Sequence, residues 1–147
     1  VTSSNTLPYS ACNLGFPPQK IRKIYGAAKI YDTRVGTDPD FYDIINNNEL
    51  TLIAQTGKEY GTTTGRLRTV NYLNMDKLLQ ALYISGTTDL IISKIDILES
   101  VNIYKYIYKN EICTFATIDS MLESIKDIIN QENTNINIIL SRSPKEI

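Results

Sequence analysis

Residues 89–96 read Asp-Leu-Ile-Ile-Ser-Lys-Ile-Asp, and this stretch decides the fold. A short apolar run that ends in polar residues is typical of a buried strand, which we expect over residues 89–95. Asp96 would then lie at the carboxyl end of that strand. Because ligands bind outside the carboxyl ends of the strands in open α/β sheets, the stretch predicts a binding site as well as a central strand.

Extended and helical patterns alternate on both sides of this strand. A helix is expected over residues 75–83, with Leu78, Leu79 and Leu82 on its buried side. The clearest helix is expected over residues 118–130, where the apolar residues at i, i+3 and i+4 spacing are Met121, Leu122, Ile125, Ile128 and Ile129. The other predicted segments are a helix over 17–25, extended chain over 27–35, a loop or short helix over 43–49, and strands over 50–54, 103–108 and 135–140. The tyrosines of 103–108 are equally typical of an edge strand. Such alternation predicts an α/β fold with a mostly parallel sheet and flanking helices.

A second informative segment is the polar loop at residues 61–68, which reads Gly-Thr-Thr-Thr-Gly-Arg-Leu-Arg. The guanidinium groups of Arg66 and Arg68 present forks of donors that match carboxylate or phosphate in a bidentate manner. Gly61 and Gly65 allow the backbone to approach a ligand closely. The composition predicts an anion-binding loop, although a surface loop with two solvated arginines fits the segment alone equally well.

The polar end of the central strand suits the recognition of a purine base. A carboxylate such as that of Asp96 can accept two hydrogen bonds from guanine, one from N1 and one from the exocyclic N2, and adenine lacks this pair of donors. The stem of Lys94 could lie along the plane of the base. For a Lys-x-Asp pair in isolation, an ordinary strand end followed by a turn is the commoner explanation.

The composition limits the remaining function classes. The 147 residues suit one compact domain, and a formal net charge of −1 with interspersed signs provides no basic surface for nucleic acid or membrane lipid. Cys12 and Cys113 lie far apart, so neither a zinc site nor a disulfide is expected, and reduced thiols in a cytosolic compartment are the default. No apolar run reaches the about 18 residues of a membrane-spanning helix. The sequence has no histidine, so any histidine acid–base chemistry must come from elsewhere.

Five segments, in order, carry a resemblance to a known family. Residues 1–6 read Val-Thr-Ser-Ser-Asn-Thr, residues 31–36 read Tyr-Asp-Thr-Arg-Val-Gly, and Glu59-Tyr60-Gly61 leads into the loop at 61–68. Residues 93–98 read Ser-Lys-Ile-Asp-Ile-Leu, and residues 141–144 read Ser-Arg-Ser-Pro. From Val1 to Ile147 the chain resembles adenylosuccinate synthetase, a ligase of purine biosynthesis.

The resemblance implies a P-loop-like, G-protein-like nucleotide-binding architecture and a defined reaction. In that family inosine monophosphate, aspartate and GTP become adenylosuccinate, GDP and phosphate with magnesium bound. The γ-phosphoryl group goes to the 6-oxygen of the purine, which turns this oxygen into a good leaving group, and the aspartate amine then displaces it. Positioning and charge neutralisation dominate a transfer of this kind.

Roles for individual residues follow from the resemblance alone. Arg66 would bind the aspartate carboxylate while lying near the inosine monophosphate, and Arg68 would be shared between aspartate and GTP. The predicted substrate-binding residues, from the monophosphate contact to the loop that closes on aspartate, are Thr2, Thr62, Thr63, Thr64, Gly65, Arg66, Leu67 and Arg68. The predicted GTP-binding residues are Arg68, Lys94, Ile95, Asp96, Ser141, Arg142 and Ser143.

The chain departs from the family pattern in four places. Leu67 stands where the family often has arginine or proline, and Tyr72 stands where tryptophan is usual. Ser143 replaces a glycine, which could loosen the choice of nucleoside triphosphate. Between Tyr104 and Thr117 a short link takes the place of a long stretch with a Pro-Gly-Trp motif, as in compact phage and viral relatives.

Those relatives provide the nearest alternative function, in which aspartate is joined to deoxyguanylate on the route to 2-aminoadenine DNA. The residues that discriminate between the two monophosphates belong to the amino-terminal half of the family, outside this chain. A non-catalytic relic that binds purine nucleotides is a second alternative. A guanine-nucleotide switch that reads GTP through Lys94 and Asp96 fits less well, since it leaves the loop at 62–68 unexplained.

We expect residues 1–147 to form the carboxyl-terminal part of one adenylosuccinate synthetase-like domain. The chain begins with Val1 inside a motif, and the family's phosphate-binding glycine loop, catalytic aspartate and catalytic histidine lie upstream of that point. No catalytic residue and no metal ligand is therefore expected here, and the fragment is not expected to be active alone. The resemblance also implies a cytoplasmic homodimer that uses GTP and Mg²⁺, with an arginine borrowed across the interface from outside this stretch.

Overall fold

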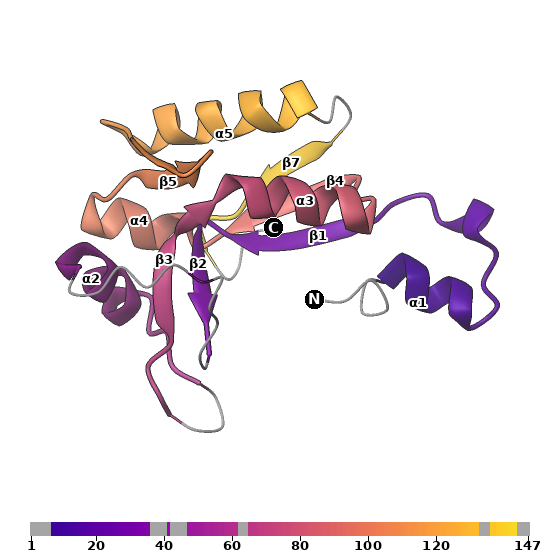
Figure 1. Ribbon diagram of the computed structural model, residues 1–147, viewed down its shortest axis with the longest axis horizontal. Coiled ribbons are helices and arrows are strands. Elements are labelled where there is room, and N and C mark those ends of the chain that lie inside the picture. Colours follow the sequence, from indigo (N-terminus) through magenta and orange to yellow (C-terminus); the bar gives the residue numbers. More distant parts are fainter. Residues whose placement is uncertain (1–6, 36–40, 42–46, 62–64, 133–135, 144–147) are drawn as a thin grey trace.

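A computed structural model of the chain has an α/β fold in which helices pack around two sheets (Figure 1). It describes residues 7–35, 41, 47–61, 65–132 and 136–143. The helices are α1 (Leu7–Asn13), the 3-10 turn η2 (Pro18–Lys20), α2 (Asn48–Thr56), α3 (Met75–Ser85), α4 (Ile95–Val101) and α5 (Ile118–Glu132). The strands are β1 (Tyr25–Lys29), β2 (Tyr31–Arg34), β3 (Thr69–Asn74), β4 (Asp89–Ser93), β5 (Lys105–Tyr108), β6 (Glu111–Thr114) and β7 (Asn137–Leu140). The predicted fold class is confirmed.

The first sheet is parallel, has the order β1-β4-β7, and so places β4 at its centre. Leu90 and Ile92 of β4 lie on the same face of the sheet and are each only 1% exposed, whereas Ile91 on the opposite face is partly buried. The central strand predicted over residues 89–95 is confirmed, although it ends at Ser93. The strand predicted over 135–140 is confirmed as β7 over Asn137–Leu140, and residue 135 lies outside the described residues.

The second sheet is mixed and has the order β2-β3-β5-β6. Its β3 and β5 pair in parallel, whereas β2 with β3 and β5 with β6 are antiparallel pairs. Because β5 lies between two strands, the tyrosines of the strand predicted over 103–108 do not mark an edge. The short link between Tyr104 and Thr117 contains the β5–β6 hairpin, whose turn residues Lys109 and Asn110 have φ angles of 51° and 63°. Two consecutive left-handed residues are typical of the tight turns that connect hairpin strands.

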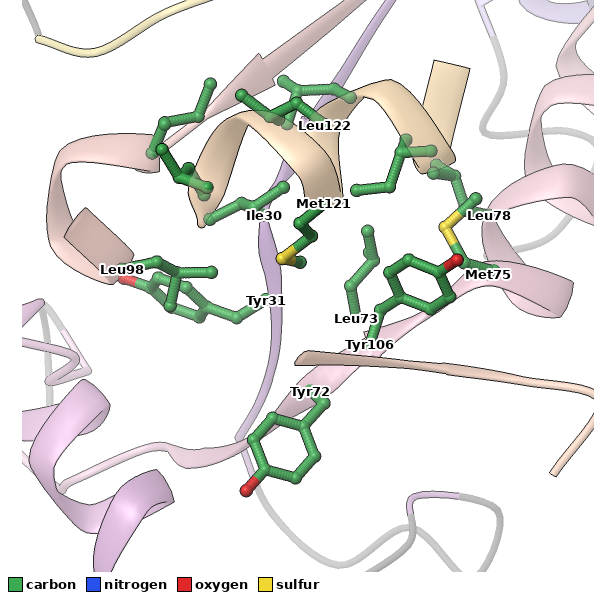
Figure 2. Close-up of a cluster of buried hydrophobic side chains, with 14 of the residues drawn as sticks. Ile30, Tyr31, Tyr72, Leu73, Met75, Leu78, Leu98, Tyr106, Met121 and Leu122 are labelled. Atoms are coloured by element: carbon green, nitrogen blue, oxygen red, sulfur yellow. The ribbon is translucent and has the colours of Figure 1, made fainter. Parts of the chain in front are cut away.

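The hydrophobic core lies where α5 packs over the strands (Figure 2). Figure 2 shows Met121 of α5 directed into a cluster with Ile30, Tyr31 and Leu73. The apolar face predicted for this helix is confirmed, and its buried residues are Ile118, Met121, Leu122, Ile125, Ile128 and Ile129. The helix predicted over 75–83 is confirmed as α3, which buries Met75, Leu78 and Leu82 and leaves Leu79 partly buried against the core.

The strand predicted over residues 50–54 is wrong, because these residues belong to α2. The side chain of Asn47 caps the helix by accepting hydrogen bonds from two backbone N–H groups of its first turn, at 2.9 and 3.4 Å. A short apolar run is compatible with either a strand or a helix. Here the cap at Asn47 favours the helix. Leu50 and Ile53, three residues apart, both face the core. Of the loop or short helix predicted over 43–49, the first four residues lie outside the described part of the chain, and the last two begin α2.

The helix predicted over residues 17–25 is also wrong, since only η2 forms there and none of its residues is buried. The backbone of Ile24 instead bonds to Thr88: the Ile24 oxygen accepts from the Thr88 N–H at 2.9 Å, and the Ile24 N–H donates to the Thr88 hydroxyl at 2.9 Å. These bonds lead the chain straight into β1. The extended chain predicted over 27–35 is confirmed in β1 and β2. No predicted element corresponds to α1, α4, β3 or β6.

Asp32 on β2 gives the fold a testable pH dependence. Its carboxylate accepts a hydrogen bond from the Asn74 N–H at 3.1 Å, but burial outweighs this bond and raises the pKa of Asp32 to about 6. The native state therefore holds this proton more tightly than the unfolded state, and the stability that it provides is lost as the pH rises from about 4 to about 6.

We expect Asp32→Asn to remove this loss and to raise the free energy of unfolding near neutral pH by about 1–3 kcal/mol. Urea unfolding of the natural protein and of the variant between about pH 4 and pH 7 measures the difference. An unchanged pH dependence in the variant would contradict the assignment to Asp32.

Candidate functional site

The carboxyl ends of β1, β4 and β7 meet at one edge of the parallel sheet, and the predicted GTP-binding residues of two distant segments lie there. Backbone pairing continues up to this edge. The N–H of Ile30 donates to the oxygen of Ser93 at 2.9 Å, and the N–H of Ser141 donates to the oxygen of Ile92 at 2.9 Å. The segment that starts at Ser141 is thereby brought beside the segment that starts at Lys94.

The turn from β4 into α4 presents two of the predicted base-reading side chains. Lys94 adopts a left-handed backbone conformation with φ of 67°, which is uncommon for a residue other than glycine, and it is the single residue between β4 and α4. Ile95 is 0% exposed and anchors the turn in the core. Asp96 follows in the first turn of α4 and is partly buried. A short, fixed turn therefore carries Lys94 and Asp96 at the edge of the sheet.

The segment after β7 is held by contacts with its surroundings. The buried Ser141 hydroxyl donates to the backbone oxygen of Ser143 at 3.0 Å. The guanidinium of Arg142 pairs with Glu99 on α4 at 3.1 Å and with Asp119 on α5 at 3.3 Å. Arg142 thus ties the end of β7 to both helices, although exposed pairs of this kind contribute little to stability.

The predicted aspartate loop closes as a hairpin of the backbone. Gly65 donates to the oxygen of Gly61, Gly61 donates to the oxygen of Arg66, and Arg68 donates to the oxygen of Glu59, each at 2.8 Å. Gly65 has a φ of 62°, which a side chain would disfavour. The backbone of the loop is therefore fixed where it joins the body of the protein.

The side chains of this loop differ in exposure. Arg66 and Leu67 are exposed, whereas Arg68 at the base of the hairpin is partly buried. The Nε atom of Arg68 is buried and has no hydrogen-bond acceptor among the residues that the structure describes, which leaves one guanidinium donor unsatisfied by them. The remaining predicted substrate-binding residues, Thr2, Thr62, Thr63 and Thr64, lie outside the described residues.

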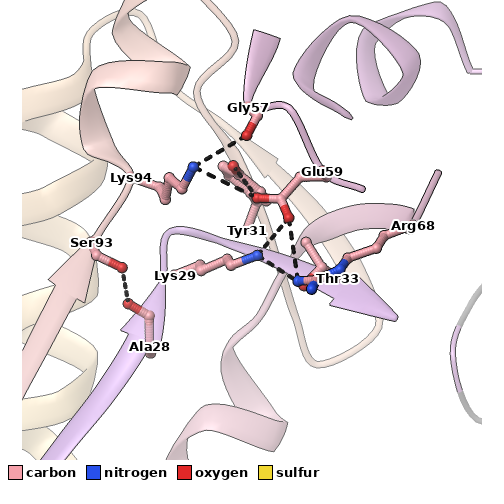
Figure 3. A network of polar contacts seen from close by, with 9 residues as sticks. All are labelled: Ala28, Lys29, Tyr31, Thr33, Gly57, Glu59, Arg68, Ser93 and Lys94. Carbon is pink, nitrogen blue, oxygen red and sulfur yellow. Dashed lines mark hydrogen bonds and ion pairs between the residues drawn. The ribbon is translucent and has the colours of Figure 1, made fainter. Parts of the chain in front are cut away.

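Glu59, which is 4% exposed, joins the loop to the edge of the sheet (Figure 3). Its carboxylate accepts hydrogen bonds from Lys29 at 2.7 Å and from the Tyr31 hydroxyl at 2.8 Å. It also pairs with Arg68 at 3.6 Å and with Lys94 at 4.0 Å. One buried carboxylate therefore contacts a predicted substrate-binding arginine and a predicted base-reading lysine.

The charge of Glu59 is stabilised by these neighbours. Burial by itself would raise the pKa of the Glu59 carboxyl, but the hydrogen bonds from Lys29 and Tyr31 and the positive charges of Lys29 and Lys94 outweigh it and hold the pKa below its ordinary value. Burial, together with the charges of Glu59 and Asp96, raises the pKa of the Tyr31 phenol. Glu59 is therefore ionised and Tyr31 neutral at physiological pH.

Gly57 allows these groups to approach one another. The ammonium of Lys94 donates to the backbone oxygen of Gly57 at 3.2 Å. A Cβ atom at position 57 would lie only 2.4 Å from the hydroxyl oxygen of Tyr31. Any side chain there would displace Tyr31 and with it the hydrogen bond to Glu59, so the site requires glycine at this position.

A second carboxylate cluster lies at the start of α2. The Tyr72 hydroxyl donates to Glu49 and accepts from the Asn47 side chain at 3.1 Å, and Lys105 donates to the two oxygens of Glu49 at 2.6 and 2.8 Å. These contacts join α2 to β3 and β5. Tyr72 thus has a hydrogen-bonding role here.

Glu59 was not among the residues predicted for the site. The sequence carries only one signal for it: Glu59 is the sole acidic residue between positions 50 and 75, and it directly precedes the loop with Arg66 and Arg68. Its partners Lys29 and Lys94 lie far away in the sequence. Within the part of the chain that the structure describes, no three His, Cys, Asp or Glu side chains gather where they could hold a metal ion. No helix in that part is long and apolar enough to cross a membrane.

The sequence profile of adenylosuccinate synthetase matches residues 1–134. The chain belongs to the adenylosuccinate synthetase family. It is 40% identical over 119 residues to adenylosuccinate synthetase of Syntrophomonas wolfei, a match that covers 78% of this chain and 28% of that protein. It is 37% identical over 137 residues to the protein of the same name from Candida glabrata, which covers 90% of this chain and 30% of the relative. The chain thus spans less than a third of the length of these relatives.

A solved structure extends the comparison to the fold. The structure of fully ligated adenylosuccinate synthetase from Plasmodium falciparum matches 95% of this chain and 42% of that chain with a TM-score of 0.65. At 20% sequence identity, this likeness concerns the fold alone. The predicted α/β architecture agrees with the fold of that structure.

The ionised Glu59 predicts a loss of stability in acid. Because the pKa of Glu59 is lower in the folded than in the unfolded chain, the stability that it provides is present above the ordinary glutamate range and is lost as the pH falls through that range and below it. Near neutral pH, Glu59→Gln should reduce the free energy of unfolding by about 2 kcal/mol, since the amide leaves three cations without their carboxylate.

Urea unfolding between about pH 3 and pH 7 tests this expectation. Glu59→Gln should lose less stability in acid than the natural protein. Glu123→Gln, which changes an exposed glutamate on α5, serves as the control and should follow the natural protein at every pH. If Glu59→Gln matched this control near neutral pH, the buried charge cluster would not contribute to stability.

Proposed function

We propose that the protein that carries this sequence is a GTP-dependent ligase of purine nucleotide biosynthesis. It would condense inosine monophosphate with aspartate to adenylosuccinate through a 6-phosphoryl intermediate. The observation that carries the proposal is the meeting of Arg68 and Lys94 at the buried carboxylate of Glu59. Membership of the family and the names of the relatives support the reaction class.

The guanine base would bind at the edge of the parallel sheet. Asp96 would accept hydrogen bonds from N1 and N2 of the base, and the stem of Lys94 would lie along its plane. The ammonium of Lys94 donates to Gly57 and pairs with Glu59, which leaves the stem as the part of the side chain that can face a base. Ile95 would anchor the turn, and the neighbouring residues Ser141, Arg142 and Ser143 would complete the pocket.

Aspartate would bind to the hairpin loop. Arg66 would bind its carboxylate, with Gly65, Leu67 and the three threonines of the loop closing around it, and Thr2 would contact the monophosphate. Arg68 would be shared between aspartate and GTP. The buried Nε of Arg68, which finds no acceptor among the described residues, supports this role, because an anionic ligand can supply one.

In the proposed reaction the purine 6-oxygen attacks the γ-phosphorus of GTP, and the bond to the β–γ bridging oxygen breaks to release GDP. The aspartate amine then forms the bond to C6 as phosphate departs with the former 6-oxygen. The residues of this chain would hold the two partners in position and neutralise their charges, while the acid–base groups lie elsewhere in the protein. Mg²⁺ would neutralise the phosphates when bound, and no ligand to it is assigned among the described residues.

The remainder of the proposal concerns the whole protein. Residues 1–147 would form the carboxyl-terminal part of one domain, inactive without its amino-terminal half, in a cytoplasmic homodimer. A second candidate function, the joining of aspartate to deoxyguanylate, is favoured by one observation: β5 and β6 are connected by a tight hairpin turn where the family has a long stretch. A nucleotide-binding relic without chemistry is the third candidate.

A product assay separates the three candidates. The full natural protein is incubated with GTP, Mg²⁺ and aspartate, and either inosine monophosphate or deoxyguanylate is added, with detection by mass spectrometry. We expect adenylosuccinate from inosine monophosphate. A condensation product from deoxyguanylate alone would identify the second function, and no product from either would favour the relic.

The base-reading assignment is tested by Asp96→Asn. Because an amide presents one acceptor where a carboxylate presents two, the variant should lower the preference for GTP over ATP by about tenfold or more. Arg66→Leu is the matched control: it should abolish aspartate incorporation and leave the preference for guanine in nucleotide binding intact. An unchanged preference in Asp96→Asn would show that another residue reads the base.

A further inference from the structure

We propose that Glu59 is a positioning residue that couples the aspartate loop to the guanine-binding edge of the sheet. This inference rests on the proposed function, because it assumes that Arg68 and Lys94 bind ligands. It adds a residue to which neither the sequence nor the comparisons give a role in binding.

The two oxygens of the Glu59 carboxylate share the same pattern of contacts. Oε2 accepts a short hydrogen bond from Lys29 at 2.7 Å and faces Arg68 at 3.6 Å. Oε1 accepts a short hydrogen bond from Tyr31 at 2.8 Å and faces Lys94 at 4.0 Å. Each oxygen therefore has one close partner from the strands and one more distant cation from a predicted ligand-binding segment.

The close partners fix the carboxylate to the body of the protein. Lys29 is the last residue of β1, and Tyr31 is the first residue of β2 and 2% exposed. Both belong to sheet strands, which are among the most rigid parts of a fold. Glu59 itself is buried, so its position is set by the sheets rather than by solvent.

The distant partners are held by charge and backbone rather than by short side-chain hydrogen bonds. Arg68 is tied to Glu59 through the backbone bond at the base of the loop, and Lys94 is tied to Gly57, two residues before Glu59. Arg68 lies 3.6 Å and Lys94 lies 4.0 Å from the buried Glu59 carboxylate. At these distances the electrostatic attraction favours one position of each cation, but it does not occupy all of the N–H groups of that cation. Arg68 thus keeps donors for ligands and the stem of Lys94 stays available to a base, while both side chains share one reference point.

Because Arg68 and Lys94 both pair with Glu59, the binding of aspartate and the binding of GTP should be coupled. A shift of Glu59 displaces Arg68 and Lys94 together, so the loss of its charge should weaken the binding of aspartate and of GTP in the same variant. A purely structural role would lower the amount of folded enzyme and leave both KM values unchanged.

The test compares Glu59→Gln with Glu49→Gln in the full natural protein. Glu49 is a matched control, because it also accepts hydrogen bonds from a lysine and a tyrosine, Lys105 and Tyr72, and among the described residues it contacts none of the predicted binding residues. We expect Glu59→Gln to raise the KM for aspartate and the KM for GTP by about tenfold each, with a smaller fall in kcat, and Glu49→Gln to change both by less than about twofold.

Hydrogen exchange measured by mass spectrometry provides a second readout that does not require activity. Glu59→Gln should increase exchange in the peptides that cover residues 65–68 and 94–98, and Glu49→Gln should not. Equal exchange in the two variants would overturn the positioning role even if the natural protein formed no condensation product. If Glu59→Gln increased exchange in an active enzyme but left both KM values unchanged, the proposed coupling would be wrong. If the natural protein formed no condensation product, only the proposed function would be refuted.

Discussion

The buried charge of Glu59 is the constraint on which the arrangement of the candidate site depends. A carboxylate that is 4% exposed is stable in its ionised form only if cations and donors surround it. Lys29, Tyr31, Arg68 and Lys94 meet this requirement, and they come from four different segments. The need to compensate one charge therefore determines how the ends of two sheets, a loop and a helix-starting turn lie relative to one another.

The sequence was informative where the decisive contacts are local. Helix α5 was predicted correctly because its buried residues repeat along one helical face, and β4 was predicted correctly because its apolar run is bounded by polar residues. The segment 50–54 was too short for the spacing of its apolar residues to distinguish a helix from a strand. The cap at Asn47 determined that it is helical. The segment 17–25 was mispredicted because its end bonds to Thr88, a partner 64 positions away from Ile24.

The same distinction applies to the site. Lys94, Asp96 and the loop with Arg68 were predicted because their residue types suit a chemistry that can be recognised within a few positions. Glu59 has no such local signal, since its hydrogen bonds to Lys29 and Tyr31 span 30 and 28 positions. A residue that acts by joining distant segments becomes visible only when the fold brings those segments together.

The β5–β6 hairpin between Tyr104 and Thr117 is joined to the candidate site by contacts through α2. The tight turn of the β5–β6 hairpin keeps β5 inside its sheet, and Lys105 at the start of β5 binds Glu49 in the first turn of α2. Helix α2 is capped at its other end by Gly57, whose oxygen accepts from Lys94. A continuous series of contacts therefore runs from the hairpin through α2 to the turn that carries Lys94. Glu49 fixes the start of α2, whereas Lys29 and Tyr31 set the position of Glu59, so each carboxylate orders its own end of this series.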